Sequence, residues 1–272
     1  MLRDGAWSGQ RCFIIGGGPS LRGFDYSRLR GELVIGVNRA FEQFDPSLLV
    51  TMDDRFLRWA RNGELGEAAK AIYNTKAMRL FYATCGHERH GFRRLDGSGK
   101  QFAWSFSQPL LHCNNSGFAA LQVACVLGAN PIYLLGFDMG GCSESGNQEW
   151  CHDGYPVVRS NDAYIPFIEM FDTAAPEIAS RGYRVVNMSR GSALRCFEFG
   201  DFDSVEPLPS RPIVVSYYTK DSAYKDEAEK MKASAHRFGL ECDVCGIDPR
   251  GGWQANTRYK AEFLRQMLAK HN

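Results

Sequence analysis

The feature that most constrains the fold is a series of short, almost continuously apolar runs, each followed by glycine or polar residues. The runs span residues 11–15, 33–37, 48–52, 131–135 and 183–186. Apolar positions without alternation are typical of strands that are buried on both faces, as in a parallel sheet covered by helices. Strict alternation would instead indicate a half-exposed antiparallel sheet.

Helical patterns separate these runs. The clearest begins at Ser116, a candidate N-cap, and stops at Gly128. Another runs from Pro166 to Gly182, and Pro176 is expected to kink or divide it. Strands and helices in this alternation predict an α/β fold with a doubly wound, mainly parallel, Rossmann-like sheet.

A change of composition divides the chain. Residues 207–212, Pro-Leu-Pro-Ser-Arg-Pro, predict a linker because three prolines fall within this short segment. We therefore expect a Rossmann-like nucleotide-binding transferase domain over residues 1–206 and a βαβα extension over residues 213–272. Two βα units form only a small core, so the extension either docks on the main sheet or begins a larger domain. Its expected elements are strands at 213–218 and 240–246 and helices at 222–238 and 257–270.

The charge balance excludes some partners. The 272-residue chain has a net charge of +1 at pH 7, which gives no bulk attraction for nucleic acid or an anionic membrane. No stretch approaches the roughly 18 apolar residues of a membrane span, and the N-terminus lacks a signal-peptide core. We expect a cytoplasmic protein without nucleic-acid partners or a membrane span. A basic segment at residues 87–100 is either a solvated surface or a loop for an acidic partner.

The cysteines do not predict a metal site. Nine scattered cysteines indicate reduced thiols rather than a disulfide scaffold. Cys242 and Cys245 form a C-x-x-C pair, but no second pair has zinc spacing. Cys142, Cys151 and His152 lack a fourth ligand nearby.

Residues 13–20, Phe-Ile-Ile-Gly-Gly-Gly-Pro-Ser, place three glycines where an apolar strand ends. Glycine tolerates positive φ, and consecutive backbone N–H groups can then face one phosphate. The run matches neither G-x-G-x-x-G nor the Walker pattern, so it predicts neither NAD binding nor a P-loop NTPase. A tight strand exit without a ligand is the alternative.

Polar residues follow the other predicted strands as well. Ligands of open α/β sheets bind at the carboxyl ends of the strands, so these residues are expected to meet in one crevice. Each one alone also fits a turn or a helix cap. They are Asn38, Asp53, Asp54 and Asp138, together with Asn115 and Ser116 at the start of a helix.

A long polar loop at residues 139–162 follows the fourth of these strands and is typical of a lid or substrate loop. His152 can shuttle a proton near neutral pH, and Asp153 beside it could orient the ring. Tyr155 and Arg159 are candidates to support a phosphate leaving group. An exposed histidine without a function is the alternative for His152.

Two segments carry a family resemblance. Residues 14–29 read Ile-Ile-Gly-Gly-Gly-Pro-Ser-Leu-Arg-Gly-Phe-Asp-Tyr-Ser-Arg-Leu. Residues 115–118, Asn-Ser-Gly-Phe, are followed at 127–138 by Leu-Gly-Ala-Asn-Pro-Ile-Tyr-Leu-Leu-Gly-Phe-Asp. Over residues 11–200 the chain resembles the bacterial single-domain sialyltransferases that use CMP-sialic acid. The same signature marks a broader family that includes the archaeal 6-hydroxymethylpterin pyrophosphokinases.

The resemblance implies that the glycine run and Asn38 meet the phosphate and sugar of a nucleotide, while Ser116, Gly117 and Asp138 shape the nucleoside pocket. The sialyltransferases carry a tyrosine directly after the G-x-D motif and a histidine base downstream. This chain has Met-Gly at 139–140, which leaves Tyr155 and His152 as the candidates. With the strand-end residues, the expected nucleotide-binding set is Gly16, Gly17, Gly18, Pro19, Ser20, Asn38, Asp53, Asn115, Ser116, Gly117 and Asp138.

The tail has a resemblance of its own. Residues 214–264 resemble the opening of a nucleotide-diphospho-sugar glycosyltransferase domain, but the sequence given stops before the metal-binding D-x-D segment of such domains. The tail is therefore expected to be a truncated, inactive domain. Its presence favours glycan assembly over pterin synthesis.

The leading hypothesis is a sialyltransferase-like glycosyltransferase of glycan biosynthesis with no permanently bound cofactor. It would move a sugar from a nucleotide-activated donor, CMP-linked by preference, to a glycan or other hydroxyl acceptor. His152 would act as base, with Tyr155 or Arg159 supporting the departing phosphate. One alternative is a diphosphokinase for a pterin-like alcohol, with Mg²⁺ held by Asp53, Asp54 and Asp138. Another is a noncatalytic nucleotide- or glycan-binding module, or a phage or envelope assembly component, that keeps the pocket without the chemistry.

Overall fold

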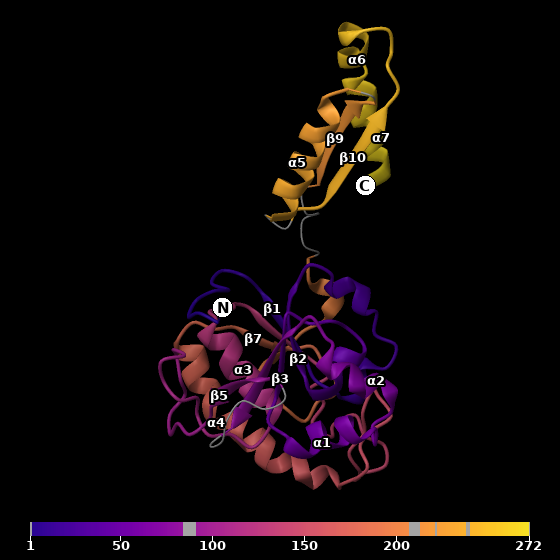
Figure 1. Cartoon of the computed structure of the whole chain (residues 1–272). Helices are drawn as coiled ribbons and strands as arrows, with labels where there is room; N and C mark the ends of the chain where they lie inside the picture. The colour runs from indigo at the N-terminus through magenta and orange to yellow at the C-terminus, as the bar shows by residue number, and fades with distance from the viewer. Residues whose placement is uncertain (1, 84–90, 207–212, 221, 238–239, 272) are drawn as a thin grey trace. The chain divides into compact units, whose positions relative to one another are not determined.

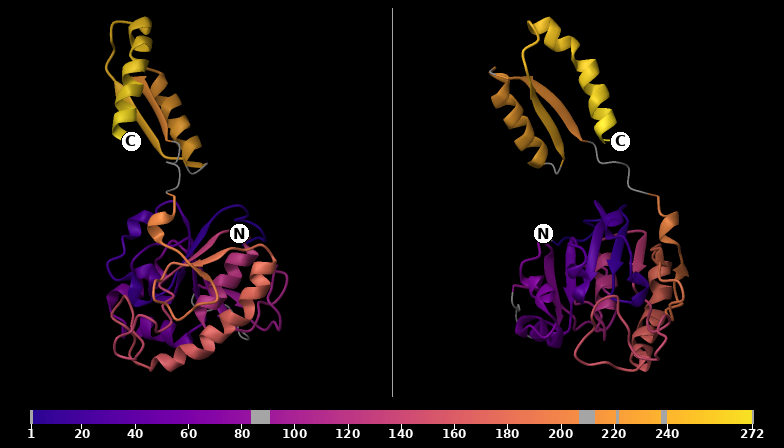
Figure 2. Two further views of the ribbon diagram at one scale, coloured as in Figure 1. Left: turned by 180° about the vertical axis from the view of Figure 1, so that it is seen from behind. Right: turned by 90° about the vertical axis from the view of Figure 1, so that its right-hand side faces the viewer.

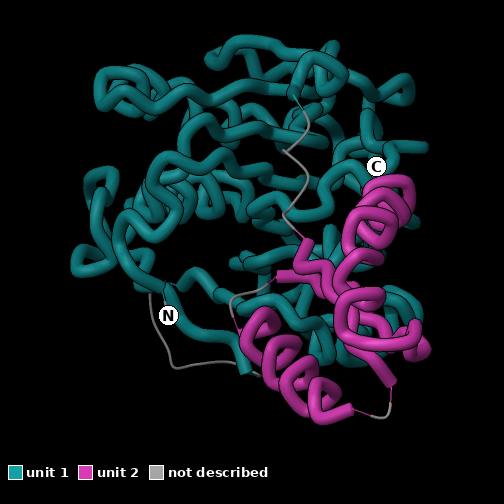
Figure 3. Tube along the Cα trace, turned by 90° about the horizontal axis from the view of Figure 1, so that it is seen from above, with its two compact units in different colours: residues 1–206 teal, residues 207–272 magenta. Residues whose placement is uncertain are grey.

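The computed structural model describes residues 2–83, 91–206, 213–220, 222–237 and 240–271. The chain divides into two compact units, residues 1–206 and residues 207–272, which Figure 3 shows in different colours. The segment predicted as a linker, 207–212, lies outside the described residues. Each unit is described by itself below.

The first unit contains one sheet of eight strands, and every neighbouring pair is parallel. The strand order is β5-β4-β3-β2-β1-β6-β7-β8, which confirms the predicted doubly wound Rossmann-like sheet. The strands are β1 (Cys12–Ile15), β2 (Leu33–Val37), β3 (Leu48–Thr51), β4 (Met78–Ala83), β5 (Arg93–Asp96), β6 (Ile132–Leu135), β7 (Val185–Asn187) and β8 (Glu198–Phe199).

Helices cover both faces of this sheet, as Figures 1 and 2 show. Alternate strand residues point to opposite faces, so Ile14 and Ile35 join a core with α3 (Ser116–Val126) and α4 (Ile165–Ser180). On the other face Leu49 packs with residues of α1 (Asp54–Asn62) and α2 (Glu67–Lys70). Burial on both faces explains why the strands are apolar without alternation. Short 3-10 helices complete the unit: η1 (Pro19–Leu21), η2 (Tyr26–Leu29), η3 (Asn38–Glu42), η4 (Ala71–Tyr73), η5 (Asn161–Tyr164) and η6 (Phe202–Ser204).

Two details of the helices differ from expectation. The N-cap of α3 is Asn115, whose Oδ1 accepts from the Phe118 N–H at 2.7 Å, so the predicted cap at Ser116 is wrong by one residue. This releases the Ser116 hydroxyl for another contact. In addition, α4 continues through Pro176 instead of dividing there.

The second unit is a small parallel βαβα arrangement. Strands β9 (Val214–Thr219) and β10 (Cys242–Ile247) pair in parallel, and α5 (Tyr224–Arg237) contacts both. The rings of Tyr217, Tyr259 and Phe263 pack together. Phe263 belongs to α7 (Lys260–His271), which follows α6 (Trp253–Arg258).

The glycine run after β1 lies against the end of β6. A Cβ on Gly16 would lie 2.6 Å from the Gly136 carbonyl oxygen, and one on Gly18 would lie 1.8 Å from Oδ2 of Asp138. Real Cβ atoms do not approach this closely, so these two glycines allow the loops after β1 and β6 to touch. A Cβ on Gly17 would instead meet the edge of His152 at 3.2 Å.

The run is not the anion-binding nest that the sequence suggested, because none of the three glycines has a positive φ. Its N–H groups are largely in use: Gly16 donates to Leu135 O and Gly18 donates to Gly136 O. The Ser20 N–H donates to Asp138. Within the described residues, this leaves the N–H of Gly17 as the one in this segment without a protein acceptor. The glycines serve close packing first.

We predict that Gly18→Ala destabilises the first unit by about 3 kcal/mol or more, because the new methyl group would overlap the Asp138 carboxylate. Gly17→Ala is the matched control, and its loss should stay near or below about 1 kcal/mol, since the neighbouring ring can shift slightly. Urea denaturation measures both. Equal losses for the two variants would contradict the close-packing explanation.

Candidate functional site

A cavity of about 380 Å³ opens beyond the carboxyl ends of β1, β2, β3 and β6. Strands β1 and β6 are neighbours at the point where the strand order reverses, since the chain leaves β1 toward β2 and later returns to its other side. The loops after the two strands diverge there, and ligands of open α/β sheets bind in the crevice between them. The volume lies within the range of about 300–1,000 Å³ of small-molecule sites.

The structure brings most of the predicted residues together. Ser20 does not line the cavity, and neither do Asp54 and Asp153. The predicted residues that line it are Gly16, Gly17, Gly18, Pro19, Asn38, Asp53, Asn115, Ser116, Gly117, Asp138, His152, Tyr155 and Arg159. Their binding and catalytic roles stay predictions.

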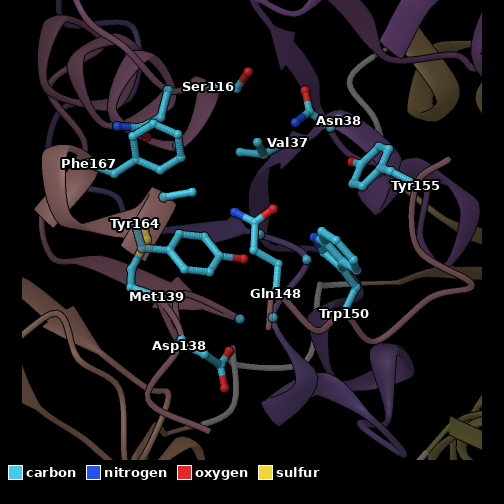
Figure 4. Close-up of a pocket in the computed structure, with 18 of the residues that line it drawn as sticks. Val37, Asn38, Ser116, Asp138, Met139, Gln148, Trp150, Tyr155, Tyr164 and Phe167 are labelled. Carbon is cyan, nitrogen blue, oxygen red and sulfur yellow. The ribbon is translucent and has the colours of Figure 1, made fainter. Parts of the chain in front are cut away.

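Asp138 links the loops after β1 and β6, which flank the point of strand-order reversal, called the switch point below. Its side chain is buried, with only 1% of the residue exposed. Oδ1 accepts from the Ser20 N–H at 3.0 Å and Oδ2 accepts from the Ser20 hydroxyl at 2.8 Å. In Figure 4 the carboxylate lies at the edge of the pocket, away from the amide and hydroxyl groups of its centre. Asp138 therefore lines the edge of the cavity while both of its oxygens hold Ser20.

Two side chains on the opposite wall keep donors available. Oδ1 of Asn38 accepts from the Thr51 hydroxyl at 2.8 Å, which fixes the amide and leaves its NH₂ group. The Ser116 hydroxyl oxygen accepts from the Met52 N–H at 3.1 Å, which leaves its O–H proton. Both are uncharged donors of the kind that orient a base or a ribose.

Backbone strain is concentrated at this cavity. Asn38 and Met139, with φ of 51° and 49°, are the non-glycine residues of positive φ within the described ranges. Both line the cavity. Such conformations cost free energy and persist where the surroundings enforce them, which is common at functional sites.

The long loop after β6 is tied to the glycine run. The Cys151 N–H donates to the Gly17 carbonyl oxygen at 3.0 Å, which places Trp150 and His152 on either side of this bond along the cavity wall. The two rings are parallel to within 17°, with centroids 6.1 Å apart. Tyr155 packs edge-on against both, with centroid distances of 5.3 Å to each. The predicted lid loop thus forms an ordered aromatic wall.

The hydrogen bonding of His152 defines its chemistry. Nδ1 accepts from the Gly154 N–H at 3.0 Å, so the proton of the neutral ring is on Nε2, which faces Gly17. Burial, and secondly the charge of Arg39, lower the pKa of His152 from 6.5 to about 3. At neutral pH the ring is therefore a donor at Nε2. Both the bonded Nδ1 and the lowered pKa disfavour proton uptake by this ring, and the predicted role of His152 as a base stays a prediction.

Tyrosines supply further neutral donors. Burial raises the pKa of Tyr155 well above its usual value, so the phenol keeps its proton. Burial, together with the charge of Asp138, also raises the pKa of Tyr164 to about 12. In Figure 4 the hydroxyl of Tyr164 points toward the side chain of Gln148, whose amide lies near the centre of the pocket.

The sequence reasoning missed several cavity residues: Trp59, Gln148, Tyr164 and Phe167. Trp59, Tyr164 and Phe167 lie away from the strand ends, which were the signal used, and Gln148 belongs to the predicted substrate loop but was not singled out within it. Tyr164 and Phe167 lie at the start of α4, on either side of Ile165 and Pro166, so an aromatic pair at a helix start is the pattern that could have indicated them.

One exposed cation of the cavity lining is available to a ligand. Arg159 lines the cavity, and within the described residues no ion pair holds its guanidinium. Arg55 also lines it but pairs with Asp53 at 3.2 Å. The described part of the chain contains no group of three histidine, cysteine or acidic side chains that could hold a metal ion.

Comparisons with known proteins add little. No family model matches the chain, and no curated protein matches it. Among solved structures the chain is similar to a MAf glycosyltransferase from Magnetospirillum magneticum AMB-1, with a TM-score of 0.48 and 16% identity. The similarity covers 76% of this chain and 36% of that one, so this chain spans only about a third of that protein. Among the described residues, no helix is both long and apolar enough to cross a bilayer.

We predict a pH dependence of stability from His152. Because its pKa falls from 6.5 to about 3 on folding, the unfolded chain binds a proton in that window that the folded chain does not. The free energy of unfolding is therefore unaffected by this proton above about pH 6.5 and decreases as the pH falls from 6.5 toward 3. Between about pH 7 and about pH 5 the native chain should lose roughly 2 kcal/mol more than His152→Gln. Parallel losses in the two proteins, measured by urea denaturation, would rule out a neutral buried ring.

Proposed function

We propose that the first unit is a glycosyltransferase that binds a nucleotide-activated sugar in this cavity and transfers the sugar to a hydroxyl acceptor. The observation that carries the proposal is the composition of the cavity at the switch point. It combines aromatic faces, uncharged donors and one available arginine. This set fits a ligand with a flat ring, a polyol and an anionic group. The preference for a CMP-linked donor rests on the sequence resemblance described above.

Each part of such a donor has a chemically suitable partner. The aromatic rings of Trp150 and Tyr155 offer surfaces against which a base can stack. The Asn38 amide and the Ser116 hydroxyl offer hydrogen bonds to the base or ribose. Arg159 offers the positive charge for the phosphate.

The transfer breaks the bond between the anomeric carbon and the phosphate oxygen, and the electron pair leaves with the nucleotide. The acceptor oxygen forms the new bond to that carbon, and its proton passes to an oxygen of the departing phosphate or to water. Negative charge therefore grows on the phosphate, where fixed donors lower the barrier. Arg159, the neutral Tyr155 and the Nε2–H of His152 are the donors that we assign to this role.

The diphosphokinase alternative fits the residues less well. It needs Asp53, Asp54 and Asp138 as Mg²⁺ ligands. Asp138 already holds Ser20 with both oxygens, and Asp53 caps α1 and pairs with Arg55. A noncatalytic nucleotide-binding module keeps the same cavity, and turnover of a CMP-sugar by the pure protein would exclude it.

We predict that Arg159→Gln weakens CMP binding by about tenfold or more, because a charge-assisted bond to phosphate is lost. Binding of cytidine, which lacks the phosphate, should change little. Arg30→Gln is the control, since Arg30 is exposed but does not line the cavity. Titration calorimetry measures all combinations. An equal loss for CMP and cytidine would contradict the phosphate role, and no CMP binding by the native chain would overturn the proposed function.

We predict that His152→Gln lowers the rate of sugar transfer. Neither the native chain nor the variant should show an inflection near pH 6.5 that arises from His152, because the native ring does not titrate there. The pH profile of CMP release from a CMP-sugar measures this. An inflection near pH 6.5 that is present in the native chain and absent in His152→Gln would contradict this prediction and support His152 as a general base.

A further inference from the structure

A buried ion pair lies behind the aromatic wall. Arg39 and Glu42, both in η3, have side chains only 3% and 4% exposed. Nε of Arg39 donates to Oε1 of Glu42 at 2.6 Å, and Nη2 donates to Oε2 at 2.8 Å. Neither residue lines the cavity. A buried ion pair rarely stabilises a fold more than apolar side chains of similar volume would, so a contribution to stability alone does not account for this pair.

The guanidinium has donors left beyond Glu42, and they reach the long loop. Nη1 donates to the Gly154 carbonyl oxygen, and Nη2 also reaches the carbonyl of Leu65 at 3.3 Å. The N–H of the same Gly154 donates to Nδ1 of His152. Gly154 has a φ of +85°, a conformation that favours glycine. One peptide segment is thus held at its carbonyl by Arg39 and holds His152 at its N–H.

We propose that Arg39 is a positioning residue that acts through Gly154 to fix the His152 ring with its proton on Nε2, the nitrogen that faces Gly17 in the cavity wall. Its effect on a nucleotide phosphate rests on the function proposed above. The fixed tautomer does not, because it follows from the hydrogen bonds alone.

Electrostatics support the same arrangement. The cation of Arg39 opposes a second positive charge on the nearby imidazole and adds to the larger effect of burial on the pKa of His152. The other titratable groups around Arg39 are Glu42, Asp153 and Tyr155. Glu42 balances the guanidinium, so the pair can stay buried while its free donors organise the loop.

The test removes both charges at once with Arg39→Met combined with Glu42→Gln, because removing Arg39 alone would leave a buried carboxylate without a partner. The matched control is Arg11→Met with Glu32→Gln. That pair is also bidentate and largely buried, with bonds of 3.0 and 2.6 Å. Arg11 and Glu32 precede β1 and β2, at the strand ends opposite the cavity.

The first readout is ¹⁵N NMR of the histidine ring in the full chain, with the His152 signal assigned by its loss in His152→Gln. The native and control proteins should show protonated Nε2 and unprotonated Nδ1. Arg39→Met/Glu42→Gln should show mixed tautomers and a pKa moved toward 6.5. An unchanged tautomer and pKa in that folded variant would overturn the proposal.

The second readout is CMP affinity in a double-mutant cycle. Arg39→Met/Glu42→Gln should weaken binding about tenfold in the native background but add nothing in the His152→Gln background. Additive losses would overturn a role through His152. If the native chain binds no CMP while the NMR shift appears, the positioning role is supported and the proposed function is rejected.

Discussion

The contact between the loops that follow β1 and β6 determines the rest of the site. These strands are neighbours at the reversal of strand order, so their loops would normally separate. Here the absence of side chains at Gly16 and Gly18 lets them touch, and Asp138 bonds Ser20 across the contact. The cavity opens beyond this closed base. The same carboxylate that the sequence suggests as a ligand contact is therefore a clamp on the scaffold.

From that base the remaining walls follow. The carbonyl of Gly17 accepts a bond from Cys151 and thereby aligns the aromatic loop over the strand ends. Arg39 holds the same loop from behind at Gly154. Donors that are already fixed lose little conformational entropy when a ligand binds, which favours affinity and orientation. In the proposed transfer the fixed orientation matters most for His152, because its tautomer decides whether Nε2 donates or accepts a hydrogen bond.

The sheet and the strand-end part of the cavity could be predicted from the sequence. Strands buried on both faces form uninterrupted apolar runs, and polar residues follow their carboxyl ends. Strands β4, β5 and β8 were not predicted. β4 contains Arg79, β5 is an edge strand within a basic segment, and β8 is an edge strand of only two residues. The cavity-lining residues Gln148 and Tyr164 were not predicted. Gln148 lies within a long loop and Tyr164 at the start of a helix, and neither position is marked by the end of a strand. The proton position on His152 depends on a backbone N–H two residues away, which composition and spacing do not reveal.

The most direct test of the central claim is a crystal structure of the chain with bound CMP. The account predicts the nucleotide at the β1–β6 switch point, with its phosphate near Arg159 and the Nε2–H of His152 and its base against the aromatic wall. The loop after β1 should keep its contact with Asp138. A nucleotide bound elsewhere, or one whose phosphate is held by the backbone N–H groups of the glycine run, would contradict the account.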